Sequence, residues 1–356
     1  MTSSLRSLAG CPRICETAPK RARSLQSGLR LRSLSGENIK PEIDNRSSTK
    51  VINETIIRVL ACALKPTVVL QARRMRRDKR FAGRAAAMRT LRGKKALVTG
   101  AASGIGSAIA LALAQEGIDL YLVDIDKAKL ATTAHEAKGF GVRVVTRSCD
   151  LAQSDEINAM VDALLSQWGT LDLLVNNAGI AYYGPTHGMT AEQWDRILSI
   201  NLLAPIQLVR KLLPTLLARD DPHILNVCSI FGLVPMRKGA AYQTSKFGLV
   251  GLSAALRAEY DSEIGVTALC PGFVRTPMLE TFDIGPEQRR HRIPGWLCAS
   301  PKAIGAAAIH ALRRNKGIVV VTPIAQLYWL LSRLFPGAVD WLARRAWRRR
   351  QQVDER

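Results

Sequence analysis

The sequence lacks the cysteine patterns of zinc-binding and disulfide-rich proteins and the long apolar run of a membrane-spanning protein. Its seven cysteines form no C-x-x-C pair and do not cluster with the five histidines. This argues against a structural zinc site or a disulfide framework and favours a reducing compartment. No uncharged apolar run reaches the ~18 residues that a membrane-spanning helix needs. The best candidate, Ile56–Leu70, is interrupted by Arg58, Lys65 and Pro66. We therefore expect no metal centre and no spanning helix.

Acidic residues are scarce at both ends of the chain. Residues 1–95 hold 23 Lys and Arg against 6 Asp and Glu, and residues 313–356 hold 10 against 3, whereas residues 96–312 hold 18 against 20. The net charge of +22 therefore belongs to the ends. Basic ends suit an anionic membrane surface, a nucleic acid or solubility alone. The N-terminal basic run has no interleaved aromatic residues and no motif that recognises nucleic-acid sequence, so we predict no specific nucleic-acid partner.

The N-terminal region divides into two segments. Residues 1–50 are rich in Ser and Arg without periodicity, and we predict a disordered basic extension. Such a composition is also typical of a mitochondrial transit peptide, so a mitochondrial location is the alternative to a cytoplasmic, membrane-associated one. Residues 51–92 combine helical apolar spacing with a dense basic run. That pattern suits a helix lying on anionic lipid, or one packed on the body or a second subunit.

The C-terminal segment, 323–356, mixes Trp, Tyr and Leu with many Arg residues. Trp and Tyr prefer the lipid headgroup region, and Arg prefers phosphate. We predict an amphipathic segment in peripheral contact with a membrane. Docking on the body or on a partner subunit is the alternative.

Residues 93–322 alternate short apolar runs with helical patterns. Strands alternating with helices at this pitch predict a parallel sheet covered by helices on both faces. We therefore expect one Rossmann-like, doubly wound α/β domain of about seven strands. Its predicted strands begin near residues 96, 119, 143, 171, 223, 266 and 317. Ligands of such sheets lie beyond the carboxyl ends of the strands.

A glycine-rich turn joins the first strand to its helix. Gly100, Ser103, Gly104, Ile105 and Gly106 follow the apolar run, in the spacing G-x-x-x-G-x-G. Glycines let the backbone approach a pyrophosphate, and the helix N-terminus presents free N–H groups to its charge. A strand, this turn and a helix in that order predict a dinucleotide site.

An acid ends the next strand. Asp124 lies 18 residues beyond Gly106, where a carboxylate accepts hydrogen bonds from adenosine ribose hydroxyls and repels a 2′-phosphate. This predicts NAD rather than NADP. Lys127 and Lys129 follow closely and weaken the preference.

A second group of polar residues carries the predicted chemistry. Tyr242 and Lys246 are four residues apart and share one helix face. A phenol titrates near pH ~10, and a neighbouring ammonium lowers that pKa, so the pair can exchange a proton with an alcohol or carbonyl oxygen. Ser229 ends a predicted strand and can hold the same oxygen. Asn201, followed by Pro205, predicts a kink in the helix 191–217 that frees a carbonyl for water.

These motifs, in this order, make the body similar to the short-chain dehydrogenase/reductase family over about residues 93–322, and most like its branch for lipophilic alcohols such as hydroxysteroids and retinol. Further matches are Asp150, Asn176-Asn177-Ala178-Gly179 and Pro271-Gly272. The resemblance implies that Tyr242 is the general acid/base, Lys246 its cofactor-binding partner, Ser229 the residue that orients substrate, and Asn201 the holder of a water. It assigns the cofactor-binding residues as Gly100, Ser103, Gly104, Ile105, Gly106, Asp124, Asp150, Leu151, Asn177, Gly179, Tyr242, Lys246, Val274 and Thr276.

The sequence thus predicts an NAD(P)-dependent oxidoreductase, with NAD preferred, acting on a small lipophilic alcohol or carbonyl compound. The family implies a homodimer or homotetramer. The alternative is a membrane-attached, dinucleotide-binding scaffold or sensor with little turnover. A binder alone needs no proton relay, so the Ser, Tyr, Lys and Asn set favours the enzyme.

Overall fold

The computed structural model describes residues 88, 90–260, 262–278, 283–284, 294–337 and 341. They belong to one compact unit, Arg76–Arg356. The predictions for residues 1–50, for nearly all of 51–92 and for most of 338–356 lie outside the described residues.

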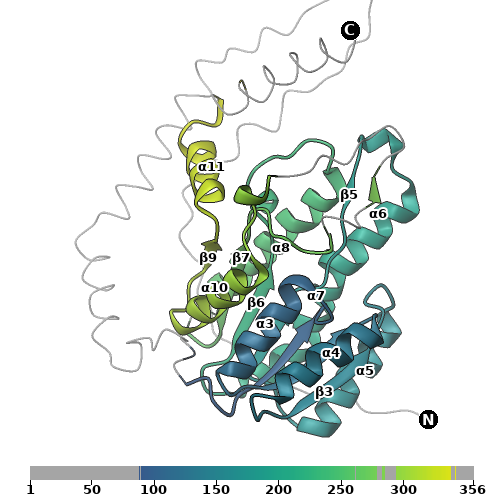
Figure 1. The fold of residues 1–356 in the computed structure, drawn as a ribbon, viewed down its shortest axis with the longest axis vertical. Helices are drawn as coiled ribbons and strands as arrows, with labels where there is room; N and C mark the ends of the chain where they lie inside the picture. The colour runs from purple at the N-terminus through teal and green to yellow at the C-terminus, as the bar shows by residue number, and fades with distance from the viewer. Residues whose placement is uncertain are drawn as a thin grey trace, which may run out of the picture. The chain divides into compact units, whose positions relative to one another are not determined.

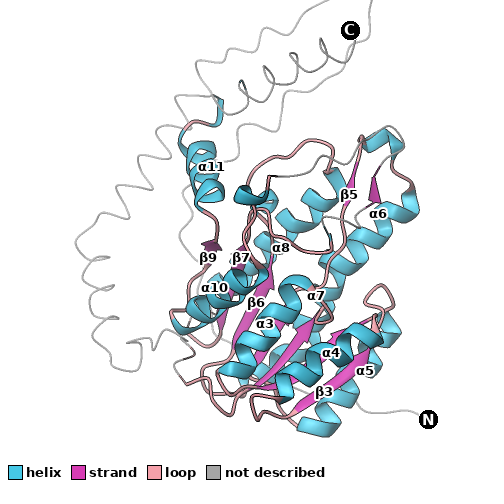
Figure 2. Ribbon diagram, viewed as in Figure 1, coloured by secondary structure: helices cyan, strands magenta, loops and turns pink. Residues whose placement is uncertain are grey.

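The predicted seven-stranded parallel sheet is confirmed (Figure 2). Its order, β3-β2-β1-β4-β6-β7-β9, reverses between β1 and β4, because the chain winds outward to β3 and then returns to the other side of β1. Ligand sites of open α/β sheets lie at such a reversal. The strands are Lys95–Thr99 (β1), Asp119–Asp124 (β2), Val144–Ser148 (β3), Leu173–Asn176 (β4), His223–Val227 (β6), Gly265–Cys270 (β7) and Ile318–Val320 (β9).

Helices cover both faces of the sheet, because successive strand side chains point to opposite sides. In β1, Ala96 and Val98 pack with the helices of one face, and Leu97 packs with those of the other. The first face carries α3 (Gly104–Gln115), α4 (Lys127–Lys138) and α10 (Pro301–Arg313), and the second carries α5 (Ser154–Trp168), α7 (Ala204–Leu217) and α8 (Ala240–Glu259) (Figure 1).

The predicted kink in helix 191–217 is a π-helical turn. Helix α6 (Ala191–Leu198) passes through the π turn Ser199–Leu203 into α7. Pro205 has no N–H for the regular ladder, which favours a wider turn just before it. In the described part of the chain this is the one helix whose length and composition would also suit a membrane span. However, its apolar face is buried against the sheet through residues such as Leu212 and Leu216.

One feature of the described residues escaped the sequence prediction, and one predicted segment is seen in part. A second small sheet pairs β5 (Tyr182–Tyr183) with β8 (Asp283–Ile284), and two residues are too few to show a strand period. Beyond β9, the predicted amphipathic C-terminal segment begins with helix α11 (Pro323–Leu334), which Thr322 caps by accepting a hydrogen bond from the Ala325 N–H.

Candidate active site

The glycine turn has a backbone that other residues would not tolerate. Gly100 and Gly104 have φ values of +65° and +58°, in the left-handed region. A Cβ atom built on Gly106 would lie 1.9 Å from the Gly100 carbonyl oxygen. Beyond this turn α3 begins, and its first N–H groups have no partner within the helix. The exposed Ser103 stands at the N-cap without a capping hydrogen bond. The turn therefore fits a pyrophosphate.

Asn177 holds this turn in place. Its Nδ2 donates to the carbonyl oxygens of Thr99 (2.9 Å) and Gly100 (3.0 Å), and its backbone N–H donates to Thr99 Oγ1 (3.0 Å). The segment after β7 reaches the same turn, since a Cβ built on Gly104 would lie 3.2 Å from Thr276 Cγ2. Val274, two residues earlier, is buried. The structure thus brings the predicted cofactor residues of three strand ends together.

Asp124 ends β2 beside the turn. One carboxylate oxygen accepts from the Ala102 N–H (2.9 Å) and the other from the Asp126 N–H (3.1 Å). The side chain of Lys129 forms an ion pair with Asp126 at 2.7 Å. Asp124 therefore presents a fixed negative charge, and Lys129 is held by a neighbouring carboxylate.

Asp150 and Leu151 follow the end of β3, as predicted. Asp150 accepts from the Ala152 N–H (3.0 Å), and its own N–H donates to Glu156. Leu151 is 8% exposed. These residues lie beyond the strand next to β2, on the side where the adenine of a dinucleotide would extend from Asp124.

The residues predicted to transfer the proton meet at the other end of the site. Ser229 directly follows β6, and its Oγ accepts from the Phe231 N–H (3.2 Å). Tyr242 lies in the first turn of α8. Burial raises the pKa of Tyr242 above its ordinary value, and a hydrogen bond with the Ser229 side chain opposes this shift. The two hydroxyl groups are therefore neighbours, as the proposed chemistry requires.

Lys246 is 4% exposed and donates from Nζ to the Val227 carbonyl oxygen (2.9 Å). Its Nζ lies 5.8 Å from the centre of the Tyr242 ring. Burial lowers the pKa of Lys246 below its ordinary value. Desolvation of the phenol is the largest effect on the pKa of Tyr242, and the lowering of that pKa by Lys246 stays a prediction.

Asn201 lies in the π turn and is fully buried. Its Oδ1 accepts from the Ile180 N–H, and its Nδ2 donates to the Ile180 carbonyl and to Ser245 Oγ, at 2.9, 2.9 and 3.1 Å. A Cβ built on Gly179 would lie 3.1 Å from Asn201 Oδ1 and 3.4 Å from Lys246 Nζ. Asn201 therefore fixes the segment after β4 against the catalytic helix. Its role in holding a water stays a prediction.

Sequence reasoning missed three residues around this group. Ser245 is fully buried and donates to the Tyr242 carbonyl oxygen (2.7 Å), so it connects Asn201 to the start of α8. The buried thiols of Cys228 and Cys270 share a hydrogen bond that raises the pKa of Cys270, and both lie near Lys246. The only sequence signal for the two cysteines was their position, since Cys228 lies between β6 and Ser229 and Cys270 ends β7.

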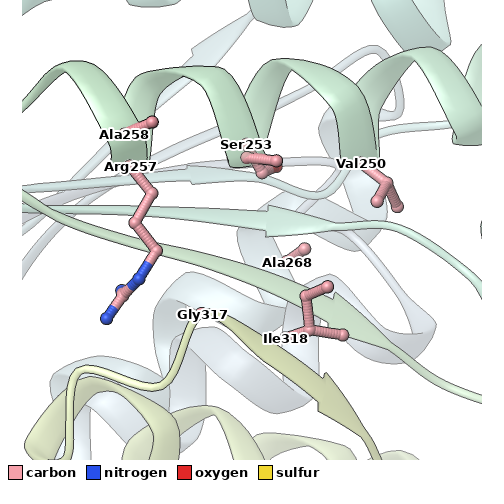
Figure 3. A pocket seen from close by; sticks show the side chains of 8 residues that line it. Val250, Ser253, Arg257, Ala258, Ala268, Gly317 and Ile318 are labelled. Carbon is pink, nitrogen blue, oxygen red and sulfur yellow. The ribbon is translucent and has the colours of Figure 1, made fainter. Parts of the chain in front are cut away.

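A separate hollow of about 430 Å³ lies between α8 and the strands β7 and β9 (Figure 3). Among its eight lining residues Arg257 is the ionisable one, and its guanidinium donates to Val266 and Asn315. Tyr242 and Lys246 are not among the lining residues. This hollow is therefore not the reaction site.

A dinucleotide cradle beside a Ser, Tyr and Lys group defines a nicotinamide-dependent oxidoreductase. Comparisons with known proteins agree. The family model for short chain dehydrogenase matches residues 94–285. The D-beta-hydroxybutyrate dehydrogenase of Cupriavidus necator is 38% identical over 248 residues, which cover 64% of this chain and 96% of that protein. The chain belongs to the short-chain dehydrogenase/reductase family, and it is an NAD(P)-dependent enzyme of that family.

Solved structures of the family resemble this one. A short-chain dehydrogenase/reductase from Burkholderia phymatum in complex with NAD aligns with a TM-score of 0.62 at 26% identity, covering 69% of this chain and 95% of that one. A metagenomic short-chain oxidoreductase in complex with NADP aligns with a TM-score of 0.56 at 33% identity, covering 66% and 99%. The neighbours thus include proteins with either nucleotide.

Proposed function

We propose that this protein oxidises a lipophilic secondary or primary alcohol, or reduces the matching carbonyl compound, with NAD as the preferred cofactor and Tyr242 as general acid/base. The observation that carries the proposal is the meeting of the Ser229 and Tyr242 hydroxyls next to Lys246, at the same sheet edge as the glycine turn. A bound nicotinamide would accept or supply the hydride.

The protein residues have separate tasks in this proposal. The turn at Gly106 and the helix behind it would hold the pyrophosphate, and Asp124 the adenosine ribose. Ser229 orients the substrate oxygen, and Tyr242 takes or gives the hydroxyl proton. Lys246, held by the Val227 carbonyl, would bind the nicotinamide ribose and supply the positive charge that favours the phenolate.

Apolar side chains on both sides of Tyr242 support a lipophilic substrate. On one side, Ser229 lies between Cys228 and Ile230, which belong to a cluster that also includes Val234, Phe231 and Leu233. On the other side, Ala241 packs with Tyr182, Ile197, Ile180, Met189 and Trp194. These apolar chain neighbours of Ser229 and Tyr242 favour an apolar substrate body around the reacting oxygen.

The preference for NAD is supported by the carboxylate of Asp124, which is fixed by two backbone N–H groups. A 2′-phosphate placed there would meet a like charge. A homodimer or homotetramer, a cytoplasmic location and contact with a membrane remain part of the same proposal.

The test is a screen of NAD and NADP reduction against simple alcohols, 3-hydroxybutyrate, steroids and retinoids, with the reverse reaction followed on the matching carbonyl compounds. We expect the highest kcat/KM for an apolar alcohol with NAD. The best turnover with 3-hydroxybutyrate would reject the lipophilic class, since the relative from Cupriavidus necator is named for that compound. Binding of nucleotide with no turnover of any compound would favour the scaffold alternative.

A further inference from the structure

Helix α11 has large apolar side chains on its outer face. Ile324, Leu327, Leu330, Leu331 and Leu334 follow one another at spacings of three, three, one and three residues, which places them on one side of the helix. Each is at least 40% exposed, and Leu334 reaches 61%. Phe335, which follows the helix, is 58% exposed. We call these six residues the outer face of α11.

The opposite side of α11 is docked on the body. Ala325 is buried, and Tyr328 and Trp329 pack against the cluster that contains Cys228, Ile230 and Val234. The Tyr328 hydroxyl donates to the Pro235 carbonyl oxygen at 3.3 Å, and Gln326 donates to the Val320 carbonyl at 2.7 Å. The helix is therefore attached, and its outer face is not a product of a loose tail.

A helix with apolar side chains on two opposite sides is expected to be shielded from water on both of them. Contiguous exposed patches of this kind mark contact with a membrane or another protein. The charge of the segment decides between them. Residues 313–356 carry a net charge of +7, and five arginines stand between 344 and 350. Two copies paired through this face would bring two positively charged segments together, and these would repel one another. An anionic lipid surface would attract the same segments.

The position of α11 connects this face to the reaction site. The helix follows β9, whose carboxyl end shares its sheet edge with β6 and β7 (Figure 1). Its contact with Pro235 is made in the segment between Ser229 and Tyr242. A surface that covers the outer face would therefore lie near the segment that surrounds the substrate oxygen.

We propose that α11 docks this protein on a bilayer that contains anionic lipids, with its outer face in the acyl region, so that the lipophilic substrate enters from the bilayer. The second half of this statement rests on the proposed function. The first half stands on the exposed face and the charge alone.

The test uses the full chain and vesicles of phosphatidylcholine, either alone or with a third of phosphatidylglycerol. We expect co-sedimentation with the anionic vesicles at low salt and little with the neutral ones. Leu327→Asp should weaken this binding about tenfold or more, because it replaces an apolar side chain of the outer face with a carboxylate that anionic lipid repels. Leu327 is 57% exposed, so the substitution leaves the core untouched.

The matched control is Phe140→Asp, which makes the same charge change at a residue that is 47% exposed in the turn after α4. It should bind vesicles like the unmodified protein. Equal weakening by both substitutions, or no binding to anionic vesicles, would overturn the proposal. A dimer in light scattering that dissociates with Leu327→Asp, while vesicle binding is unchanged, would assign the face to a second copy and would also overturn it.

Turnover separates this proposal from the function. Leu327→Asp should slow the oxidation of 2-decanol carried in vesicles by about the same factor as binding, and leave oxidation of dissolved 2-butanol unchanged. Vesicle binding without turnover of either alcohol would reject the proposed function and keep the docking surface. Equal turnover of vesicle-borne 2-decanol by both forms would reject substrate entry from the bilayer.

Discussion

The two halves of the sheet's carboxyl edge are built by different means. At β1 and β2 the site consists of backbone, with two glycines at positive φ and a turn that leaves no space for a Cβ at Gly106. At β6 and α8 it consists of buried side chains, with Lys246 at 4% exposure and Asn201 at 0%. A backbone site depends on shape, whereas a side-chain site depends on desolvation and charge. Substitutions in the two halves of the site should therefore impair the protein in different ways.

The largest effect is expected from Tyr242→Phe. Removing the hydroxyl removes the proton-transfer group, and general acid/base catalysis contributes roughly 10²–10⁴-fold. We expect kcat to fall by about 10³-fold while NADH affinity, measured by fluorescence titration, changes little. The control is Tyr260→Phe, at the other end of α8, which should behave like the unmodified protein. Undiminished turnover in Tyr242→Phe would reject the assigned role.

Gly106→Ala should disrupt the glycine turn, which is the half of the site that consists of backbone. Its Cβ would overlap the Gly100 carbonyl oxygen, which belongs to a turn that Asn177 holds, so the turn has to move. We expect nucleotide binding to be lost and the free energy of unfolding to fall by about 3 kcal/mol, as for other overpacked sites. Urea unfolding and NADH titration measure both quantities.

Gly141→Ala is the control for that substitution. Gly141 also has a positive φ, +77°, but a Cβ there meets no atom within 4 Å. Gly141→Ala should lower the free energy of unfolding by about 1 kcal/mol, which is the cost of the left-handed backbone conformation. Nucleotide binding should stay intact. Equal stability and NADH affinity in the two variants would show that the turn at Gly106 is not constrained.

This difference also explains what the sequence could predict. Glycine spacing and strand periodicity are local, so the turn and the seven strands were predicted, whereas the order of the strands in the sheet was not. The electrostatics were not, because burial depends on which distant elements cover a side chain. The desolvation that raises the pKa of Tyr242 was not visible in the sequence for this reason, and the thiol pair of Cys228 and Cys270 forms only when β6 and β7 lie side by side.

His223 should make the stability of the fold sensitive to acid. It is fully buried at the start of β6, and burial lowers its pKa from 6.5 to about 3. Thr267 Oγ1 donates to the Lys316 carbonyl, so it accepts from His223 Nε2 (2.9 Å), and Nδ1 is left without a partner. The ring is therefore neutral in the fold and cannot take a second proton without burying a charge.

The sign of the pH effect follows from proton binding. Between pH 6.5 and about 3 the unfolded chain binds a proton at His223 that the folded chain does not, so stability falls as the pH falls. Between pH 7 and pH 5 this residue should cost about 2 kcal/mol of unfolding free energy. Urea unfolding of His223→Gln should show a smaller loss over that range. His310→Gln, at an exposed position, should keep the full loss, and equal pH profiles for all three proteins would contradict the assignment.

The smallest effect is expected at Asp124, where the backbone half depends on one charge. Asp124→Asn keeps an acceptor for the Ala102 N–H and removes the negative charge, so it separates the electrostatic role from the structural one. A like charge facing a 2′-phosphate costs at least about 1 kcal/mol near a protein surface, so the ratio of kcat/KM for NADP to that for NAD should rise about tenfold. Asp119→Asn, at the opposite end of β2 where the carboxylate accepts from the Arg143 N–H, should leave the ratio unchanged. If Asp124→Asn also left it unchanged, nucleotide choice would depend on shape, and charge would matter only in the half of the site that carries Tyr242 and Lys246.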